Sequence, residues 1–401
     1  MLLHEFYPND IRVNKEASAL IAAGFEVHLI ALQRKGEAAS AEVNGIQVHR
    51  IPIAQSFFWR GIWDIRLAAN FFNGRFYSKL KQLHKQHAYD AVHVHDLQLA
   101  KTAIRFRDKV KDLKVVLDFH ENYPEALKVW FVWKRNPLIR LKNKLFFSFD
   151  RWLNYERQMA RQADRVIVVV EEMKQRVCQL HGLPPEKVVI VTNSESRSFI
   201  AQKQIPDIYE RAEGDFILSY TGGVGPHRGV DVCVKGMAHL KEFPGIRLEI
   251  TGSLSDDSRA WLENMARENE VVDKVRINGY QPFERFFSYM KFADVNLIPH
   301  NRNGHTDNTI PHKLYQGMLT AKPVLVSSAP PLKRVVESLD SGLVFEAGNP
   351  EDFAQKVALL YQDKTLYQKL GENGYRQTYE LDQNWEATGQ GLVKDYESLL
   401  D

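Results

Sequence analysis

The sequence predicts an α/β protein made of two doubly wound domains, and three observations support this class. The chain has 401 residues, more than a single hydrophobic core usually organises. Short apolar runs alternate with amphipathic stretches along nearly the whole chain, the pattern of parallel strands joined by helices. Residues 194–215 contain no apolar strand and separate two such series. We therefore expect one domain over residues 1–195 and another over residues 213–377, joined by a linker.

The first series provides the strands of the amino-terminal domain. Its first strand begins abruptly at Met1, so we expect that strand to lack a few residues at its start. Residues 14–24 (NKEASALIAAG) predict a helix that ends at a glycine. The other expected strands are residues 24–32, 89–96, 113–121, 163–172 and 187–193.

The second series provides the strands of the carboxy-terminal domain. They are expected at residues 216–223, 246–253, 274–280, 293–300, 322–328 and 342–348. Ligands of parallel sheets bind beyond the carboxyl ends of the strands. We therefore expect two Rossmann-like domains that face each other across a ligand cleft.

The composition is that of a soluble globular protein, with 44% hydrophobic and 26% charged residues. The first ten residues, MLLHEFYPND, lack the basic start and apolar core of a signal peptide, and no apolar run approaches the roughly 18 residues of a membrane span. Two distant cysteines, Cys178 and Cys233, show no zinc-site spacing. These features predict a cytoplasmic protein with reduced thiols.

Charge is distributed unevenly along the chain. Residues 1–200 carry 31 Lys and Arg against 21 Asp and Glu, whereas residues 201–401 carry 22 against 29. The net charges are therefore +10 and −7. This asymmetry indicates an anionic partner for the first half, or a chance imbalance on solvated faces.

A glycine-rich turn follows the first strand of the second series. In SYTGGVGPHRG (219–229), Gly222, Gly223 and Gly225 permit positive φ and close backbone approach, which suits an anion. Arg228 could clamp a phosphate with two hydrogen bonds. The alternative is an ordinary tight turn. Tyr280, after a later strand, either stacks on a base or packs between helices.

The stretch NTIPHKLYQGMLTAKPVL (308–325) predicts a loop, a helix and a strand. Pro311 fits the first helical position, and Lys313 adds a positive charge to a helix start that already attracts phosphate. His312 and Gln316 are four residues apart and share one helix face, where Gln316 could bind the hydroxyls of a ribose. These groups predict a pocket for a nucleoside diphosphate, unless the helix is only a well-capped one with its polar groups in water.

Six segments of the chain resemble the retaining family 4 glycosyltransferases, in the order that this family shows. The resemblance covers nearly the whole chain, and its specificity lies in the ordered set. The segments are PNDIRVNKEASALIAAGFEVHLIAL (8–32), LDFHENYPE (117–125), TGGVGPHRGVD (221–231), ADVNLIP (293–299), TIPHKLYQGMLTAKPVLVSS (309–328) and YRQTYELDQNWEATGQGLVKDYESLL (375–400).

The resemblance implies the GT-B fold and retaining transfer of a sugar, of the hexosyltransferase type, from a nucleotide donor. It implies that a final helix, about residues 378–401, returns to the first domain. It implies no cofactor and no required metal, with a UDP- or GDP-linked sugar as co-substrate. In agreement, the pocket has Arg228 and Lys313 to stabilise the leaving diphosphate and no DxD motif for a divalent ion.

The resemblance also assigns roles to individual positions. Gln316 would bind the ribose, and Asn308 with His120 would contact the donor sugar. The other donor-site positions are Gly222, Gly223, Tyr280, Thr309, Pro311 and His312.

The chain departs from the family pattern at two places. The family has two glutamates eight residues apart, where this chain has Asn308 and Gln316. Amides still bind hydroxyls, but a carboxylate makes the stronger, charge-assisted bond. The phosphate turn often has a basic residue after its first glycine, where this chain has Gly223. Arg228 must then carry more of the phosphate charge.

The acceptor is expected to approach the first half. Its candidate residues are Asn9, Asp10 and Arg12 in the first loop and Glu121 beside His120. Arg12 meets either a phosphate or a surface salt-bridge partner. His120 is either a sugar contact or a structural histidine at a strand end. Retention is thought to proceed on one face without a firmly assigned protein nucleophile, so no acid–base pair is assigned.

His93 and His95 lie on one face of a strand, which superficially suits a metal. No third ligand stands at a telling distance in the sequence, so packing is the favoured interpretation and no metal site is predicted.

Two segments, residues 56–81 and 126–152, interleave aromatic residues with Lys and Arg. This composition suits an anionic membrane surface or a lipid-phosphate acceptor, or else buried helix faces with solvated rims. Peripheral membrane binding on the cytoplasmic side is the resulting hypothesis.

The sequence thus predicts a glycosyltransferase of bacterial polysaccharide biosynthesis, acting on a lipid-linked or polysaccharide acceptor. The alternatives are a GT-B nucleotide-sugar epimerase or hydrolase, and a non-catalytic scaffold that binds sugar nucleotides. A nucleic-acid partner is not expected, because the basic excess is modest and no recognition motif is present.

Overall fold

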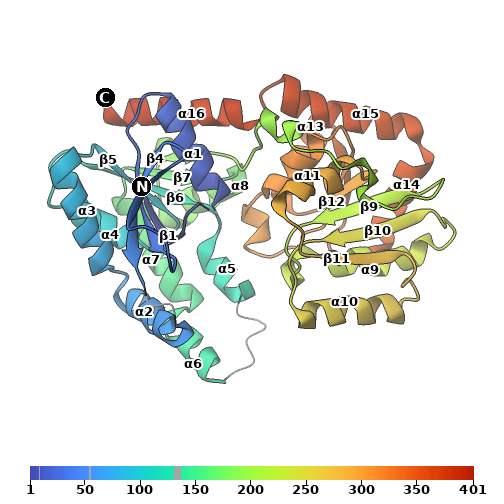
Figure 1. Cartoon of the computed structure of the whole chain (residues 1–401), viewed down its shortest axis with the longest axis horizontal. Helices are drawn as coiled ribbons and strands as arrows, with labels where there is room; N and C mark the ends of the chain where they lie inside the picture. Colours follow the sequence, from blue (N-terminus) through green and yellow to red (C-terminus); the bar gives the residue numbers. More distant parts are fainter. Residues whose placement is uncertain (9, 54–55, 131–136) are drawn as a thin grey trace. The chain divides into compact units, whose positions relative to one another are not determined.

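The computed structural model describes residues 1–8, 10–53, 56–130 and 137–401 (Figure 1). The chain forms two compact units. The first comprises Met1–Thr192 and Thr388–Asp401, and the second comprises Asn193–Ala387.

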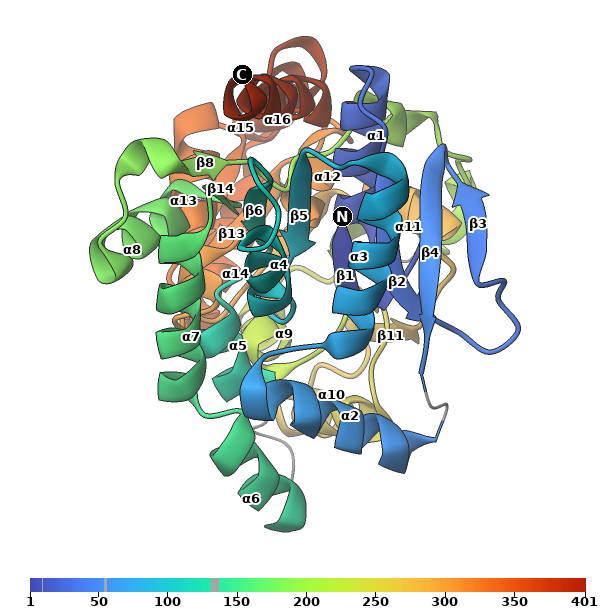
Figure 2. The ribbon, with the colours of Figure 1, turned by 90° about the vertical axis from the view of Figure 1, so that its left-hand side faces the viewer.

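The first unit is built on a mostly parallel sheet with the order β3-β4-β2-β1-β5-β6-β7-β8 (Figure 2). Its central strands are buried on both faces, and they read as continuous runs of Val, Ile and Leu in the sequence. The strands are β1 (Leu2–Phe6), β2 (His28–Gln33), β3 (Ser40–Val43), β4 (Ile46–Pro52), β5 (Ala91–His95), β6 (Lys114–Phe119), β7 (Arg165–Val168) and β8 (Val188–Ile190).

A hairpin at one edge of this sheet is absent from the sequence-based expectations. Strands β3 and β4 pair antiparallel with Val43 opposite Ile46, so Asn44 and Gly45 form a two-residue turn. Both turn residues have positive φ, 55° and 77°, as a type I′ turn requires. The Asn-Gly pair was therefore an available signal for this hairpin.

Helices cover the first sheet, and local capping explains where several of them begin. The Asp10 side chain accepts hydrogen bonds from the amides of Arg12 and Val13, and Asn73 caps a later helix in the same way. The helices are α1 (Ile11–Ala22), α2 (Phe57–Asn70), α3 (Gly74–His87), α4 (Ala100–Arg107), α5 (Tyr123–Trp130), α6 (Pro137–Phe146), α7 (Phe149–Gln162) and α8 (Glu171–His181).

The last helix, α16 (Trp385–Leu400), joins the first unit from Thr388 onwards. The Tyr396 hydroxyl lies 2.6 Å from His93 Nδ1, and Asp395 pairs with Arg165 at 3.0 Å. The chain enters this unit ten residues later than about residue 378, because Thr378 is buried and its hydroxyl bonds to Gly374 O in the second unit.

The second unit contains a wholly parallel sheet with the order β11-β10-β9-β12-β13-β14. The strand order reverses between β9 and β12, and ligands of such sheets bind beyond the strand ends at this switch point. The strands are β9 (Phe216–Thr221), β10 (Ile246–Thr251), β11 (Val275–Gly279), β12 (Val295–Ile298), β13 (Val324–Ser327) and β14 (Gly342–Phe345).

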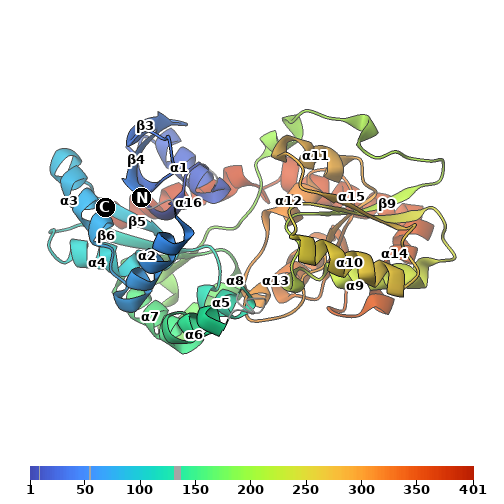
Figure 3. The same cartoon turned by 60° about the horizontal axis from the view of Figure 1, so that its bottom comes forward.

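Helices lie on both faces of the second sheet, with α9 and α10 on one face and α11 on the other (Figure 3). Phe345, Phe353 and Leu248 are fully buried in the core between the sheet and α9, α10 and α14. Each such side chain contributes about 1.5–3 kcal/mol by burial. The helices are α9 (Val230–Gly236), α10 (Asp256–Glu268), α11 (Phe283–Lys291), α12 (His312–Met318), α13 (Pro330–Leu339), α14 (Pro350–Gln362) and α15 (Lys364–Tyr375).

The stretch expected to be a linker, residues 194–215, lies within the second unit. It contains no strand, as expected, and instead forms two short 3₁₀ turns, Arg197–Ala201 and Pro206–Ile208. Phe199 and Tyr209 bury their rings against α11, which holds the segment to this unit.

Candidate functional site

Two loops meet at the switch point of the second sheet. The loop after β9 touches the loop after β12 where the Asn301 amide donates to His227 O at 3.1 Å. Gly229 has a φ of 68°, and a Cβ there would collide with Pro299 O. Gly229 thus permits the close approach of the two backbones.

The predicted phosphate turn lies in the first of these loops. Gly222 has a φ of 129°, and its amide donates to Thr251 O at 2.8 Å. Gly225, by contrast, is extended, with a φ of −166°. Of the three glycines predicted to permit positive φ, Gly222 therefore uses that freedom, and Gly223 and Gly225 do not.

Lys313 of α12 points at this turn. Its Nζ lies 3.4 Å from Thr221 O and 4.0 Å from the centre of the Tyr220 ring, which it faces. A Cβ added at Gly222 would be 3.7 Å from the same Nζ. Burial, and then the charge of Arg228, hold the pKa of Lys313 well below its ordinary value.

Arg228 is surrounded by histidines that are kept neutral. Its Nη1 lies 3.3 Å from His300 Nε2, and because Arg228 can only donate, that nitrogen accepts. Burial and then Arg228 lower the pKa of His300 well below its usual value, and lower that of His305 to about 4. The same two causes lower the pKa of His227 to about 3.

The charge around the turn is therefore positive and uncompensated. In the part of the chain that the structure describes, neither Arg228 nor Lys313 forms an ion pair with a carboxylate. Arg228 depresses the protonation of Lys313, so the two cations are costly to keep together in a partly buried place. Binding of an anion would remove this cost, so the arrangement is that of an anion site.

The helix predicted at Pro311 begins one residue later. Pro311 is the N-cap of α12, with extended backbone angles, and the helix is only seven residues long. Lys313 still falls in its first turn. The prediction of Pro311 as the first helical residue is wrong by one position because proline's extended ψ of 147° lies outside the helix.

The two amides that replace the family's glutamates are both engaged. Asn308 Nδ2 donates to Gly304 O at 2.8 Å, and the Thr309 hydroxyl donates to His305 O at 3.2 Å. Gln316 is buried, and its Nε2 donates to Glu195 Oε2 at 2.7 Å. Gln316 therefore does not face water. The alternative interpretation, a well-capped helix with its polar groups in water, does not hold for this residue. His312 lies one turn before it on α12 and is partly buried.

Tyr280 follows β11 and is 74% exposed. Packing between helices, one of the two interpretations, is therefore wrong. Stacking on a base stays a prediction.

In the first unit, His120 follows β6 and lies among carboxylates. Its Nε2 is 2.8 Å from Asp118 Oδ2, while its Nδ1 is 3.7 Å from Asp96 and 4.0 Å from Asp10. Burial alone would lower the pKa of His120, but Asp96 and Asp118 outweigh burial and raise it to about 10. His120 is therefore an imidazolium at neutral pH and presents a charged N–H donor.

Arg12 does not lie at the surface, so both interpretations offered for it are wrong. It is 4% exposed, and its Nε and Nη2 donate to the two oxygens of Asp118 at 3.0 and 2.7 Å. Its Nη1 donates to Val191 O at 2.8 Å, and Nη2 also pairs with Glu16 at 2.9 Å. Arg12 thus orients the carboxylate that holds His120, and it is not placed to contact an acceptor.

The other acceptor candidates are placed as follows. Asp10 caps α1, and its second oxygen is the one that approaches His120. Glu121 directly follows His120 and is partly buried. Asn9 lies outside the described residues. An acceptor role for Asp10, Glu121 and Asn9 stays a prediction.

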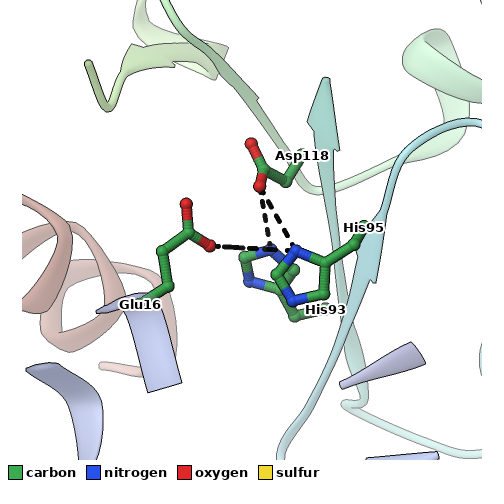
Figure 4. Close-up of side chains that lie close together, drawn as sticks. All are labelled: Glu16, His93, His95 and Asp118. Carbon is green, nitrogen blue, oxygen red and sulfur yellow. Dashed lines mark ion pairs between the residues drawn. The ribbon is translucent and has the colours of Figure 1, made fainter. Parts of the chain in front are cut away.

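His93 and His95 lie in a larger buried cluster than the sequence suggested (Figure 4). Glu16 and Asp118 approach them, with His93 Nε2 3.4 Å from Glu16 and His95 Nδ1 3.4 Å from Asp118. The fold thus brings two carboxylates to the histidines that sequence spacing alone did not place near them. Arg12 already contacts both carboxylates, and burial raises the pKa of Glu16 to about 8. At neutral pH Arg12 and Asp118 therefore form the buried ion pair, with a mostly protonated Glu16 beside them.

Sequence reasoning missed the residues that support the two cations and His120. They are Tyr220, His227, His300 and His305 in the second unit, and Glu16, Asp96 and Asp118 in the first. Asp118 stands in β6, two residues before His120, which directly follows the strand, so the period-two alternation of the strand was an available signal.

Comparisons with known proteins identify the family of the chain. A family model described as glycosyl transferases group 1 matches residues 201–377, and one described as glycosyltransferase family 4 matches residues 12–194. Together the two models match most of the chain, which thus belongs to the family 4 glycosyltransferases.

Among curated relatives, an uncharacterised glycosyltransferase of Methanocaldococcus jannaschii is 23% identical over 241 residues, covering 60% of this chain and 61% of the relative. A D-inositol 3-phosphate glycosyltransferase of Thermomonospora curvata is 23% identical over 269 residues, covering 61% of this chain and 59% of that enzyme. The chain spans about 60% of the length of both relatives.

Solved structures show the same fold. Sucrose-phosphate synthase from Thermosynechococcus elongatus has a TM-score of 0.77 at 17% identity, covering 99% of this chain and 94% of the other. HepE of Anabaena, solved with UDP, has a TM-score of 0.70 at 13% identity and covers 99% of each chain. The fold is GT-B, as the resemblance implied.

Proposed function

We propose that the protein transfers a sugar from a nucleoside-diphosphate donor to a lipid-linked or polysaccharide acceptor, with retention at the anomeric carbon and without a required metal ion. The leaving diphosphate binds at the turn after β9. Arg228 and Lys313 carry the positive charge there. For His120, in the first unit, we propose the donor-sugar role that the family resemblance implies.

One observation carries this proposal: the partly buried pair of cations, Arg228 and Lys313, without a carboxylate partner in the described part of the chain. As the bond between sugar and diphosphate breaks, negative charge develops on the leaving phosphate. Cations that are fixed in place before the reaction stabilise that charge without reorganising. The UDP held by the similarly folded HepE supports a nucleoside diphosphate as the ligand.

The first prediction concerns nucleotide binding. UDP, GDP or ADP, or one of their sugar conjugates, should raise the melting temperature of the purified protein, because a ligand that binds the native state stabilises it. At a concentration of 100 Kd the stabilisation is about 2.7 kcal/mol. Differential scanning fluorimetry with and without EDTA measures it.

A shift with one nucleotide that EDTA leaves unchanged is the expected result, and it also identifies the base. A shift that EDTA abolishes would contradict metal independence alone. If no nucleotide shifts the melting temperature, the diphosphate site itself is refuted. Sugar release or epimerisation without acceptor would favour the hydrolase or epimerase, and binding without turnover would favour the scaffold.

The acceptor side of the proposal rests on helix α6. Leu141 and Leu145 are four residues apart on one face and are 56% and 58% exposed. Arg140 and Lys144, also exposed, lie beside them. Between Glu125 and Asp150 the sequence holds six Lys and Arg and no acidic residue. An anionic bilayer, whose lipids combine negative head groups with apolar chains, is the partner that fits this helix face.

No helix in the described ranges has the length and apolar content to cross a membrane. We propose that attachment through α6 is peripheral and at the cytoplasmic face. There a lipid-linked acceptor presents its head group to the enzyme.

The second prediction tests this helix. Wild-type protein should float with vesicles that contain phosphatidylglycerol and should release at high salt. The variant Leu141→Gln/Leu145→Gln should lose binding by about 10-fold or more, because each leucine contributes about 1.5–3 kcal/mol when fully buried. Flotation against vesicle concentration measures the loss.

The matched control is Leu180→Gln on α8, a leucine that is 43% exposed. Its basic neighbour one turn earlier, Arg176, is paired with Glu156 at 2.8 Å, and α8 begins with two glutamates. It should bind vesicles like the wild type. Equal loss in both variants, or wild-type binding that ignores salt and lipid charge, would contradict the α6 surface.

A further inference from the structure

The buried contact between Glu195 and Gln316 lies beside the proposed diphosphate site. Gln316 follows Lys313 by three residues on α12, which places the two side chains on neighbouring positions of one helix face. Three residues of helix rise about 4.5 Å, the scale of the step from a phosphate to the attached ribose. The residue pair therefore stands where the sugar of a nucleotide would follow its phosphates.

The structure fixes Glu195 at this place from several directions. Its Oε2 accepts from Gln316 Nε2 at 2.7 Å, and its Oε1 accepts from the Ser196 amide at 2.8 Å. Its backbone oxygen accepts from the Trp385 amide at 2.9 Å, and Asn193 Nδ2 donates to Ile310 O at 3.0 Å. The segment before Glu195 is thus tied to the loop that precedes α12.

We propose that Glu195 is the carboxylate that binds the ribose hydroxyls of the donor, with Gln316 as its partner. This rests on the proposed function. A carboxylate accepts several hydrogen bonds at once, so it can hold a pair of vicinal hydroxyls while Gln316 orients it. The amide oxygen of Gln316 adds a further acceptor. The charge that is missing at position 316 is supplied by a residue 121 positions earlier in the chain.

The same contact explains why an amide stands at position 316. A glutamate there would bring two buried carboxylates to hydrogen-bond distance, and like charges that close cannot both be ionised. The two positions are therefore coupled: one carries the carboxylate and the other the amide. Exchanging them preserves one charge and one hydrogen bond.

The experiment compares three ligands on four proteins: the wild type, Glu195→Gln, Gln316→Glu and the exchange variant Glu195→Gln/Gln316→Glu. The ligands are the nucleoside diphosphate that stabilises the wild type, its 2′-deoxy form and inorganic pyrophosphate, which has no ribose. Calorimetry gives Kd, and circular dichroism with the melting temperature confirms folding.

Glu195→Gln should weaken binding of the nucleoside diphosphate by about 10-fold or more, since a hydrogen bond to a charged group is worth that factor. Pyrophosphate should bind Glu195→Gln like the wild type. The 2′-deoxy ligand should bind the wild type weakly. Its affinity should fall less between the wild type and Glu195→Gln than the affinity of the nucleoside diphosphate does. The exchange variant should recover at least part of the loss.

Equal weakening of diphosphate and pyrophosphate by Glu195→Gln would overturn the ribose role and leave a structural one. Unchanged binding of every ligand would overturn it as well. If Gln316→Glu fails to fold, the affinities of the wild type and of Glu195→Gln for the nucleoside diphosphate and its 2′-deoxy form still test the ribose role of Glu195. Failure of the proposed function is a separate result, because the wild type would then bind neither pyrophosphate nor any nucleotide.

Discussion

Replacing Arg228 by alanine is expected to lower kcat/KM by about 10²–10³-fold, the usual cost of removing one fixed group that stabilises transition-state charge. Lys313 alone would then face the leaving diphosphate. Arg228→Lys should recover part of the loss, because lysine keeps the charge but cannot hold a phosphate with two parallel hydrogen bonds. Steady-state rates with the donor identified by thermal shift measure both variants.

A second measurement distinguishes a direct role of Arg228 from a structural one. The pKa of Lys313 is lowered by burial and by Arg228, so an anion that binds there should raise that pKa and draw a proton from solution. Uptake is expected above the lowered pKa and below the ordinary lysine value of about 10.4. Removing Arg228 raises the pKa of Lys313 in the free protein, so Arg228→Ala should take up fewer protons than the wild type when the anion binds. Calorimetry in buffers of different ionisation enthalpy measures the protons.

The matched control is Arg276→Ala in the same unit. Arg276 is 54% exposed and pairs at 3.3 Å with Glu210, which is 83% exposed, so its loss should change turnover little. A near-normal rate for Arg228→Ala, or a loss that Arg276→Ala reproduces, would refute the charge-stabilising role.

Much of the fold could be predicted because parallel strands buried on both faces have a strong local signature. Each expected strand of the second series is present as β9 to β14, within a few residues of its predicted bounds. The edge hairpin of β3 and β4 was missed because exposed edge strands alternate polar residues and lack continuous apolar runs. Its Asn-Gly turn, however, is a local signal that sequence reasoning could have used.

The sequence could indicate a candidate site residue only where the residue type and the neighbouring sequence are sufficient to suggest its role. Gly222, Arg228 and Lys313 meet this condition. Arg12 does not, because its burial depends on Asp118, which is 106 positions away. Gln316 depends in the same way on Glu195. Local patterns contain no information about such distant partners, so the sequence predicted a surface arginine and a lone amide where the structure has two buried pairs.

Replacing Arg12 by methionine is expected to destabilise the first unit by about 3–5 kcal/mol, the cost of leaving a buried ionic partner uncompensated. Asp118 would lose two hydrogen bonds and its ion pair, and Glu16 would lose its contact with Arg12 Nη2. Denaturant-dependent hydrogen exchange of the β5 and β6 amides reports this unit. Because the pKa of His120 is raised to about 10 in the folded unit, its own stabilisation is full below about pH 6.5 and fades towards pH 10. The stability of Arg12→Met should therefore be compared with that of the wild type at about pH 6, where His120 is charged.

The control for size and charge is Arg34→Met, an arginine 33% exposed that pairs with Glu37 at 3.3 Å. Its loss should cost about 1 kcal/mol or less. The double variant Arg12→Met/Asp118→Asn removes both charges and should lose less than the two single variants together, by about 0.5–3 kcal/mol. If Arg12→Met costs no more than Arg34→Met, the buried network does not stabilise the unit. Strict additivity in the double variant would instead show that Arg12 and Asp118 act independently, and His120 would then need another explanation for its orientation.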